Sequence, residues 1–303
     1  MQTFILGFWP DYETYFFEAS CQELDTLKIF HPPMPPWVQK VIPKFLYRPY
    51  YRASIKGLFQ TYPHAHFICN ENISLIKSIL KYKQSHKIHL LFRNPVQSKP
   101  NLIPYITLLK AHNIKLWSFD QQDCQSYGMH FHEQFISPIP KLKNTEISHN
   151  FSFIGREKNR TEQLNQLAVL LKSSQLSYNY HIVLPSQPPL CYEDYLKVSL
   201  SGECLIDIMQ AHQSGMTLRP IEAAFYQRKL LTNNKRILTH PLYRPENILV
   251  FDESLSSEQL LSFIKKPYQT YSPKTLKVFQ SQHILKLITE NGDIPKSLKQ
   301  NKN

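Results

Sequence analysis

Residues 207–225 have the sequence DIMQAHQSGMTLRPIEAAF, and residues 229–234 have the sequence KLLTNN. This pattern predicts a loop that opens into a helix, followed by a strand. Gly215 supplies a turn, Thr217 can cap the helix, and Pro220 is tolerated in the first helical turn. Apolar residues at helical spacing then give the helix a face that packs on a sheet. The stretch therefore predicts one step of a strand and helix alternation.

The start of this helix is the first candidate site. A first helical turn carries free backbone N–H groups and the positive end of the helix dipole, and Arg219 adds a full charge, so the site suits a phosphate or diphosphate. Glu222 lies one turn further along, where a carboxylate can accept hydrogen bonds from ribose or sugar hydroxyls. The alternative is a capped surface helix with an Arg219–Glu222 ion pair, which is worth about 0.2–0.5 kcal/mol.

Length and composition indicate a folded chain of more than one domain. Its 303 residues predict two domains, and a hydrophobic content of 42% is ample for a core in each. No signal peptide is recognisable at the start, and no apolar run approaches the about 20 residues that cross a bilayer. We therefore expect a cytoplasmic protein.

Charge and cysteine usage restrict the partners. Five cysteines occur without a C-x-x-C pair, so we expect reduced thiols and neither a zinc nor a redox site. The net charge of +12 favours anionic partners, which are nucleic acid, an anionic membrane surface or a phosphorylated substrate. No RNA-recognition, helix-turn-helix or zinc-finger signature occurs, so nucleic acid is not expected. With only seven glycines and no G-x-G-x-x-G, a dinucleotide-binding Rossmann site is not expected.

The first half of the chain alternates strands and helices, which predicts a parallel sheet. We expect strands at residues 3–9, 66–69, 88–92 and 115–119, helices at residues 73–82 and 102–112, and a short helix or strand at residues 22–30. Polar residues follow two of the strands: Arg93 and Asn94 follow one, and Asp120 and Asp123 the other. Ligands of open α/β sheets bind at such strand ends, although Asp120 as a helix cap and Arg93 as a surface residue are the alternative.

A basic and aromatic run occupies residues 40–52, after a proline-rich loop at residues 31–37. Three interpretations remain open. The run stacks on a saccharide, binds acidic lipid headgroups, or coats a solvated surface.

The alternation restarts after a polar, proline-bearing linker at residues 137–148. We expect strands at residues 150–154, 180–184, 203–208, 229–232 and 248–251, and helices at residues 161–173, 192–200, 257–264 and 272–289. Gly155 is expected to end the first of these strands. Lys158 and Arg160 lie in the turn that follows, where they face a phosphate or are ordinary loop charges.

Four segments together resemble a known family: residues 92–96 (FRNPV), 117–129 (WSFDQQDCQSYGM), 152–160 (SFIGREKNR) and 215–223 (GMTLRPIEA). The chain resembles bacterial glycosyltransferases of the GT-B architecture that assemble lipopolysaccharide core, capsule or exopolysaccharide. The resemblance covers about residues 88–252. It implies an α/β protein with two Rossmann-like parallel-sheet domains facing a cleft and a C-terminal helix that packs back toward the first domain. The expected divisions are residues 1–143 on the acceptor side, 144–270 on the donor side, and 271–303 as a C-terminal helix and basic tail.

The resemblance, together with the charges above, assigns three groups of candidate residues. The nucleotide-sugar donor is expected at Gly155, Lys158, Thr217, Leu218, Arg219, Glu222 and Asn234. Catalytic candidates are Asp120, Arg160 and Glu222, and acceptor-side candidates are Arg93, Asn94 and Asp123. No convincing Asp-x-Asp motif follows a strand, so neither a metal nor a cofactor is expected. Cationic side chains would then neutralise the leaving diphosphate.

The sequence therefore predicts a metal-independent transferase that moves a sugar from a nucleotide sugar to a bacterial glycan or glycolipid acceptor. Stereochemistry is left open. A peripheral contact with the anionic inner face of the cytoplasmic membrane is a further hypothesis, based on the run at residues 40–52. A catalytically inactive GT-B-like scaffold and a basic nucleic-acid-binding protein are the alternative functions.

Overall fold

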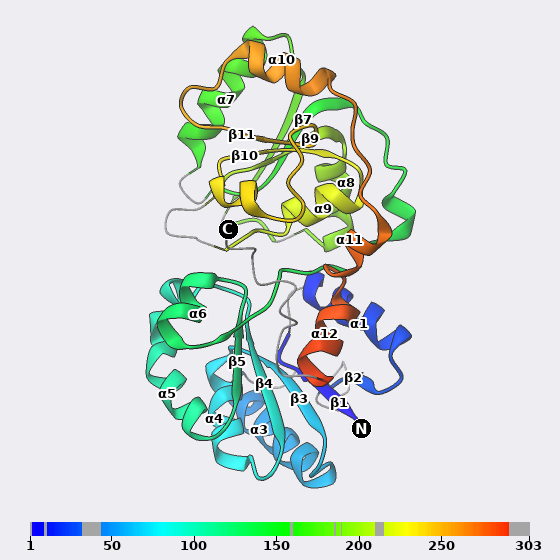
Figure 1. Cartoon of the computed structure of the whole chain (residues 1–303). Coiled ribbons are helices and arrows are strands. Elements are labelled where there is room, and N and C mark those ends of the chain that lie inside the picture. Colours follow the sequence, from blue (N-terminus) through cyan, green and yellow to red (C-terminus); the bar gives the residue numbers. More distant parts are fainter. Residues whose placement is uncertain are drawn as a thin grey trace. The chain divides into compact units, whose positions relative to one another are not determined.

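The computed structural model describes residues 2–8, 11–31, 44–157, 160–184, 186–188, 190–209 and 215–290. The chain forms two compact units, which are described separately (Figure 1). Unit 1 comprises Met1–Glu133 together with the chain from Ile284 onward, and unit 2 comprises Gln134–His283. The sequence-based divisions at residues 143 and 270 lie several residues away from these changes of unit.

Unit 1 is built on a parallel six-stranded sheet with the order β2-β1-β3-β4-β5-β6. Its strands are β1 (Thr3–Leu6), β2 (Leu27–Ile29), β3 (His66–Asn70), β4 (Lys87–Phe92), β5 (Lys115–Ser118) and β6 (His130–Phe131). Its helices are α1 (Asp11–Glu23), α3 (Lys44–Thr61), α4 (Ile73–Tyr82), α5 (Ile103–Ala111) and α6 (Gln121–Tyr127). Alternate strand residues such as Phe4, Phe67 and Leu90 are buried with residues of α3, α4 and α5, which cover one face of the sheet.

Unit 2 is built on a parallel five-stranded sheet with the order β11-β10-β9-β7-β8. Its strands are β7 (His149–Arg156), β8 (Tyr178–Val183), β9 (Gly202–Asp207), β10 (Lys229–Thr232) and β11 (Ile248–Val250). Its helices are α7 (Thr161–Ser173), α8 (Tyr192–Leu200), α9 (Arg219–Phe225), α10 (Ser257–Lys265) and α11 (Pro273–Lys277). Helices α7 and α10 cover one face of this sheet and α9 packs on the other (Figure 1).

The strand order of unit 2 fixes where its ligand site is expected. From β7 the chain crosses through α7 to β8 on one side, and then through α8 to β9 on the other side of β7. The carboxyl ends of β7 and β9 therefore flank the point where the winding reverses, and open α/β sheets bind ligands in the crevice at that point. Gly155 and Asp207 lie at these two strand ends.

The predicted α/β fold with two parallel-sheet Rossmann-like domains is confirmed. The final helix, α12 (Ser281–Glu290), belongs to unit 1 from Ile284 onward, as expected for a C-terminal helix that returns to the first domain. Helices at residues 73–82, 161–173 and 192–200 begin and end as predicted.

Three details of the expected structure are wrong. Helices α1 and α3 were not predicted. Strand β7 continues to Arg156 and so passes through Gly155 instead of ending before it. The single helix expected at residues 272–289 is two helices, because Gln280 forms a bridge with Ile136 and the backbone there bonds to Ile136 instead of continuing a helical pattern.

The side chain of Lys229 connects strand β10 to the C-terminal end of helix α10 by hydrogen bonds. Its side chain is 2% exposed, and its Nζ donates to the carbonyls of Phe263 at 2.9 Å and Lys266 at 2.7 Å, and also to that of Ile264. A cation is well placed there because the last carbonyls of a helix lack intrahelical partners and carry the negative end of its dipole.

We expect Lys229→Met to lower the free energy of unfolding by about 2 kcal/mol, because buried carbonyls lose a charged donor. Urea unfolding followed by circular dichroism measures the change. Lys265→Met, at an exposed lysine of the same helix, is the matched control and should change stability by less than about 0.5 kcal/mol. Equal losses in both variants would contradict the role given to Lys229.

Candidate functional site

Asp207, at the carboxyl end of β9, is the centre of the site in unit 2. Its carboxylate is fully buried. Oδ1 accepts hydrogen bonds from Thr217 Oγ1 at 3.0 Å and from Arg219 Nη1 at 3.4 Å, and Oδ2 accepts from Thr232 Oγ1 at 3.1 Å. The aspartate thereby connects the loop before α9 with the end of β10.

Two arginines converge on Gly155 of β7. A Cβ at this glycine would lie 3.1 Å from Arg219 Nη2 and 3.4 Å from Arg160 Nη1, so a larger residue would crowd both guanidinium groups. Both groups also lie over the ring of Phe153, with Cζ-to-centroid distances of 5.2 Å for Arg219 and 5.9 Å for Arg160. Gly155 therefore leaves the space in which the two cations meet.

The guanidinium groups of Arg219 and Arg160 differ in how many hydrogen-bond partners they have. Arg219 pairs with Asp207 and donates from Nη2 to the carbonyl of Ile154. Arg160 is 6% exposed, and its Nε has no hydrogen-bond partner among the described residues. A donor that is buried without a partner costs free energy unless a ligand or water satisfies it.

The electrostatics of the site favour an anion. Burial, followed by repulsion from Arg219, lowers the pKa of Arg160. Burial also opposes the charge of Arg219, but Tyr195, Asp207 and Glu222 outweigh it and raise the pKa of Arg219. Because Asp207 already pairs with Arg219, the guanidinium of Arg160 adds a positive charge that no ion pair with a described residue balances. A negative group between the two arginines would relieve their repulsion.

Glu222 of α9 is fully buried inside unit 2. Its carboxylate oxygens accept hydrogen bonds from the hydroxyls of Tyr192 at 3.1 Å and Tyr195 at 3.0 Å, both on α8. Burial raises the pKa of Glu222 to about 7, against the opposing effects of Arg219 and the two tyrosines. The carboxylate therefore binds α9 to α8, and its predicted contact with a ribose or sugar stays a prediction.

The start of α9 differs from the expectation. Leu218 is the N-cap residue, while Thr217 accepts from the N–H of Arg219 at 3.3 Å without capping in the usual sense. Ile221 and Glu222 donate their N–H groups to the carbonyl of Leu218, and Pro220 has none. The first turn thus offers no free N–H group, and the helix has only 7 residues. Side-chain cations, and not the helix terminus, supply the positive charge.

The alternative of an exposed Arg219–Glu222 pair is also wrong, because α9 is buried from Arg219 to Ala224 and Arg219 pairs with Asp207. Among the remaining donor-side candidates, Asn234 is 7% exposed and its Nδ2 has no partner among the described residues. Lys158 lies outside the described residues, so its predicted role is untested.

The candidates in unit 1 lie at the carboxyl edge of its sheet and are held by neighbouring groups. Asp120 caps α6 by accepting from Gln122 N at 2.8 Å, which matches the alternative given above. Asp123 accepts from Val96 N at 3.0 Å and Ser118 Oγ at 3.1 Å.

Arg93 and Asn94 bind buried carboxylates of the same unit. Arg93 Nε forms an ion pair with Glu13 at 3.0 Å, so it is not the surface residue of the alternative. Asn94 Nδ2 donates to Glu71 at 2.9 Å. None of these contacts tests an acceptor or catalytic role.

Four residues of the unit 2 site were missed: Asp207, Phe153, Tyr192 and Tyr195. Asp207 gave a visible signal in the sequence, because it is a charged residue that directly follows the apolar residues Leu205 and Ile206 at the end of a strand. The tyrosines gave no signal, because their approach to Glu222 depends on how α8 and α9 pack.

Within the described ranges, no group of three or more His, Cys, Asp or Glu side chains is placed to hold a metal ion. Within the same ranges, no helix has the length and apolar character needed to cross a membrane.

No protein-family profile matches this chain, and no curated protein sequence matches it. Solved structures do. The UDP-GlcNAc 2-epimerase of Methanocaldococcus jannaschii superposes with a TM-score of 0.53 at 10% identity, covering 95% of this chain and 99% of the other. The UDP-N-acetylglucosamine 2-epimerase of Rickettsia bellii gives 0.50 at 12% identity, with 95% and 96% covered. A putative UDP-N-acetylglucosamine 2-epimerase of Listeria monocytogenes gives 0.50 at 8% identity, with 94% and 95% covered.

These similarities extend over nearly the whole chain, and at such low identity they concern the fold alone. The chain has a GT-B-like fold of two parallel-sheet Rossmann-like domains. The expected relation to proteins of GT-B architecture is confirmed at this level.

Proposed function

We propose that this protein is an enzyme that acts on a nucleotide sugar and holds its diphosphate between Arg160 and Arg219. The observation that carries the proposal is the convergence of two buried guanidinium groups on Gly155, of which only that of Arg219 is paired with a carboxylate, Asp207. Planar guanidinium groups bind phosphate oxygens through two parallel hydrogen bonds. Nucleotide-sugar use by proteins of the same fold, as named in the similar structures, supports this choice of ligand.

The reaction that we propose is glycosyl transfer to a bacterial surface glycan, without a metal ion. In such a reaction negative charge develops on the departing diphosphate while the sugar gains oxocarbenium character. Arg160 and Arg219 are positioned to stabilise that charge in a site from which water is largely excluded. Lipopolysaccharide, capsule and exopolysaccharide are the acceptor classes proposed, on the resemblance described for residues 88–252.

Epimerisation of the nucleotide sugar is the second candidate. It is favoured by one observation, the superposition of the whole chain on UDP-GlcNAc 2-epimerases. In that case the diphosphate is bound at the same arginines, and the substrate needs no acceptor.

Binding is tested with Arg160→Gln, because Arg160 forms no ion pair with a described residue on which the fold would depend. We expect a nucleotide sugar to raise the melting temperature of the wild type, and the variant to bind it at least about tenfold more weakly after loss of a charge-assisted hydrogen bond. Lys172→Gln, an exposed lysine at the far end of α7, removes the same charge and should leave the affinity unchanged. The same measurement with UDP-, GDP-, ADP-, CMP- and TDP-sugars identifies which nucleotide the protein binds.

The proposed site would be refuted if the wild type and the two variants bound the nucleotide sugar equally well, or if none of the three bound any sugar of the panel.

The reaction is tested by NMR with the nucleotide sugar that binds. Conversion of the sugar to its 2-epimer by the protein alone would establish epimerisation. Release of the nucleoside diphosphate only after addition of a bacterial glycan acceptor would establish transfer. Binding without either reaction would support the inactive scaffold.

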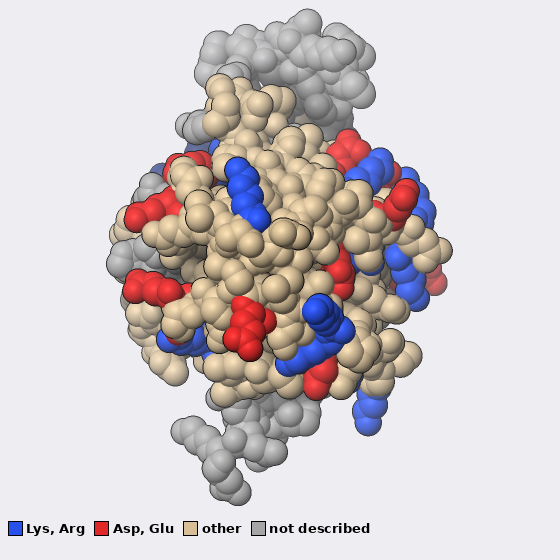
Figure 2. All heavy atoms as spheres, turned by 90° about the horizontal axis from the view of Figure 1, so that it is seen from above, with Lys and Arg blue, Asp and Glu red and all other residues tan. Residues whose placement is uncertain are grey.

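Two further proposals concern the surface. On the face shown in Figure 2, basic and acidic side chains are interspersed and do not gather into one basic patch. We propose no nucleic-acid partner. A cytoplasmic enzyme docked on an anionic membrane through residues 40–52 remains a proposal. Of that run, Tyr51 is buried in the core of unit 1 and Arg52 is exposed on α3, while the side chains of residues 40–48 lie outside the described part.

A further inference from the structure

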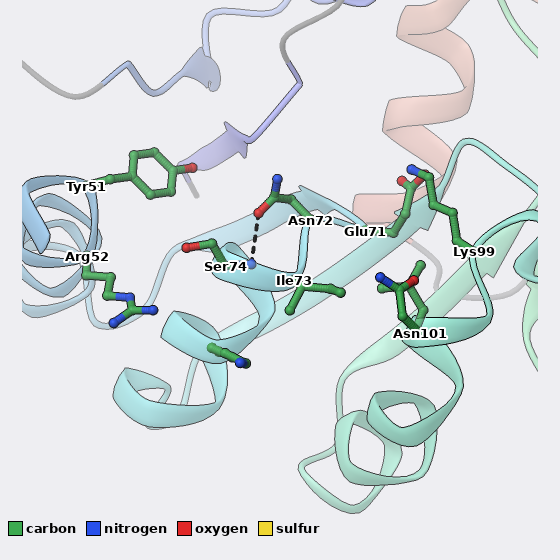
Figure 3. A pocket seen from close by; sticks show the side chains of 10 residues that line it. Tyr51, Arg52, Glu71, Asn72, Ile73, Ser74, Lys99 and Asn101 are labelled. Carbon is green, nitrogen blue, oxygen red and sulfur yellow. Dashed lines mark hydrogen bonds and ion pairs between the residues drawn. The ribbon is translucent and has the colours of Figure 1, made fainter. Parts of the chain in front are cut away.

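A pocket lies within unit 1 and has about 820 Å³ of volume, a size typical of small-molecule sites. It opens beside the carboxyl ends of β3 and β4. Figure 3 shows Tyr51 and Arg52 reaching toward it from α3, with Lys99 and Asn101 entering from the connection between β4 and α5. All its lining residues belong to unit 1, whereas Arg160 and Arg219 belong to unit 2.

The charges that line this pocket are mainly positive. Lys99 Nζ pairs with Glu71 Oε1 at 2.9 Å, where the Glu71 side chain is 3% exposed. Glu71 already accepts from Asn94 Nδ2 at 2.9 Å and from Arg93 N at 3.2 Å, so its charge is satisfied. Arg52 and Lys77 are exposed and have no ion pair with any described residue. An anion is therefore the complementary ligand.

The remaining lining suits a sugar. Asn101 is exposed, and no described group occupies its side-chain amide. Tyr51 and Leu102 give an apolar wall, and both are anchored in the core of unit 1. An apolar wall, an amide without a described partner and exposed cations together match a ligand with an apolar ring face, hydroxyl groups and a negative charge.

We propose that this pocket binds an acidic saccharide, a sugar that carries a phosphate or carboxylate group. Arg52 and Lys77 hold the acidic group, while Asn101 binds a hydroxyl. Glu71 fixes Lys99 and the wall of the pocket and does not meet the ligand. The inference goes beyond the nucleotide-sugar site and does not depend on it.

Isothermal titration calorimetry with the full chain tests the proposal at low salt, using glucose 6-phosphate, glucuronate, glucose and inorganic phosphate as probes. We expect glucose 6-phosphate or glucuronate to bind more tightly than glucose and than inorganic phosphate. In Arg52→Gln/Lys77→Gln the affinity for the acidic sugar should fall at least about tenfold, as expected for losing charged hydrogen bonds.

The matched control is Lys56→Gln/Lys81→Gln, which removes two charges from the same helices at exposed positions outside the pocket. Its affinity should stay within about twofold of the wild type, because neither lysine lines the pocket and so neither can donate a hydrogen bond to a ligand inside it. Asn101→Ala should weaken the acidic sugar and leave inorganic phosphate unchanged. Melting curves confirm that all variants fold.

Three results would overturn the proposal. The first is that neither glucose 6-phosphate nor glucuronate binds. The second is that the two double variants lose affinity equally, which would mean that the ligand responds only to the overall positive charge of the chain. The third is that inorganic phosphate binds as tightly as glucose 6-phosphate, which would indicate an anion site without sugar recognition. The nucleotide-sugar test uses Arg160, in the other unit, so the two proposals can fail independently.

Discussion

Replacing Arg219 by methionine should lower the free energy of unfolding by about 3–5 kcal/mol, the cost typical of removing one partner of a buried ion pair. The Asp207 carboxylate is fully buried and, among the described residues, would keep only the hydroxyls of Thr217 and Thr232 as hydrogen-bond partners. The carbonyl of Ile154 would also lose the donor that Arg219 Nη2 supplies. Urea unfolding near pH 7, followed by circular dichroism, measures the loss.

Two companion variants isolate the cause. Adding Asp207→Asn to Arg219→Met removes the uncompensated charge and should recover part of the stability, since an amide costs less to bury than a carboxylate. Arg156→Met, at the exposed end of β7, should cost less than about 0.5 kcal/mol. If Arg219→Met costs no more than the Arg156 variant, then Asp207 is not held by Arg219 in the way that the geometry indicates.

Much of the fold could be predicted because its signals are local. The helix at residues 73–82 carries apolar residues at helical spacing, and Asn72 caps it by accepting from two backbone N–H groups. Helix α1 has a weaker signal, because its core residues Phe16 and Phe17 are adjacent in the sequence and do not recur at helical spacing. Helix α3 was not recognisable because it contains Pro49 and a run of basic and aromatic residues, neither of which is typical of a helix interior. Tertiary packing stabilises it.

The site was predictable only in part, because it depends on the winding of the sheet. Arg160 and Arg219 could be recognised as cations next to strand ends. Their convergence on one glycine could not, since β7 and β9 become neighbours only through the reversal of strand order. Glu222 illustrates the limit most clearly. Its position in the helix suggests an accessible carboxylate, whereas α8 covers it with two tyrosines.

Glu222 should make the stability of the protein depend on pH in a recognisable way. Its pKa is about 7 in the folded protein against 4.5 for an ordinary glutamate. Between these two values the folded state retains a proton that the unfolded state has lost. The stabilising contribution of protonated Glu222 is therefore full below pH 4.5 and is lost as the pH rises through 7. The expected loss across this window is about 3 kcal/mol.

Glu222→Gln isolates this contribution because glutamine does not titrate, while every other ionisable group remains. The free energy of unfolding of the variant, minus that of the wild type, should rise by about 3 kcal/mol between pH 4.5 and pH 8. Glu162→Gln, at an exposed position in the first turn of α7, should show a difference that does not change with pH.

The sign of the slope decides the physical interpretation of this buried carboxyl group. A rise confirms that burial outweighs Arg219 and the hydrogen bonds from Tyr192 and Tyr195. A flat difference would mean that the two hydroxyls and the guanidinium compensate the desolvation of the carboxylate completely. Glu222 would then carry a full negative charge at neutral pH. In that case Asp207 and Glu222 together would balance the charges of Arg160 and Arg219, and the site would lack the positive excess that the proposed diphosphate binding requires.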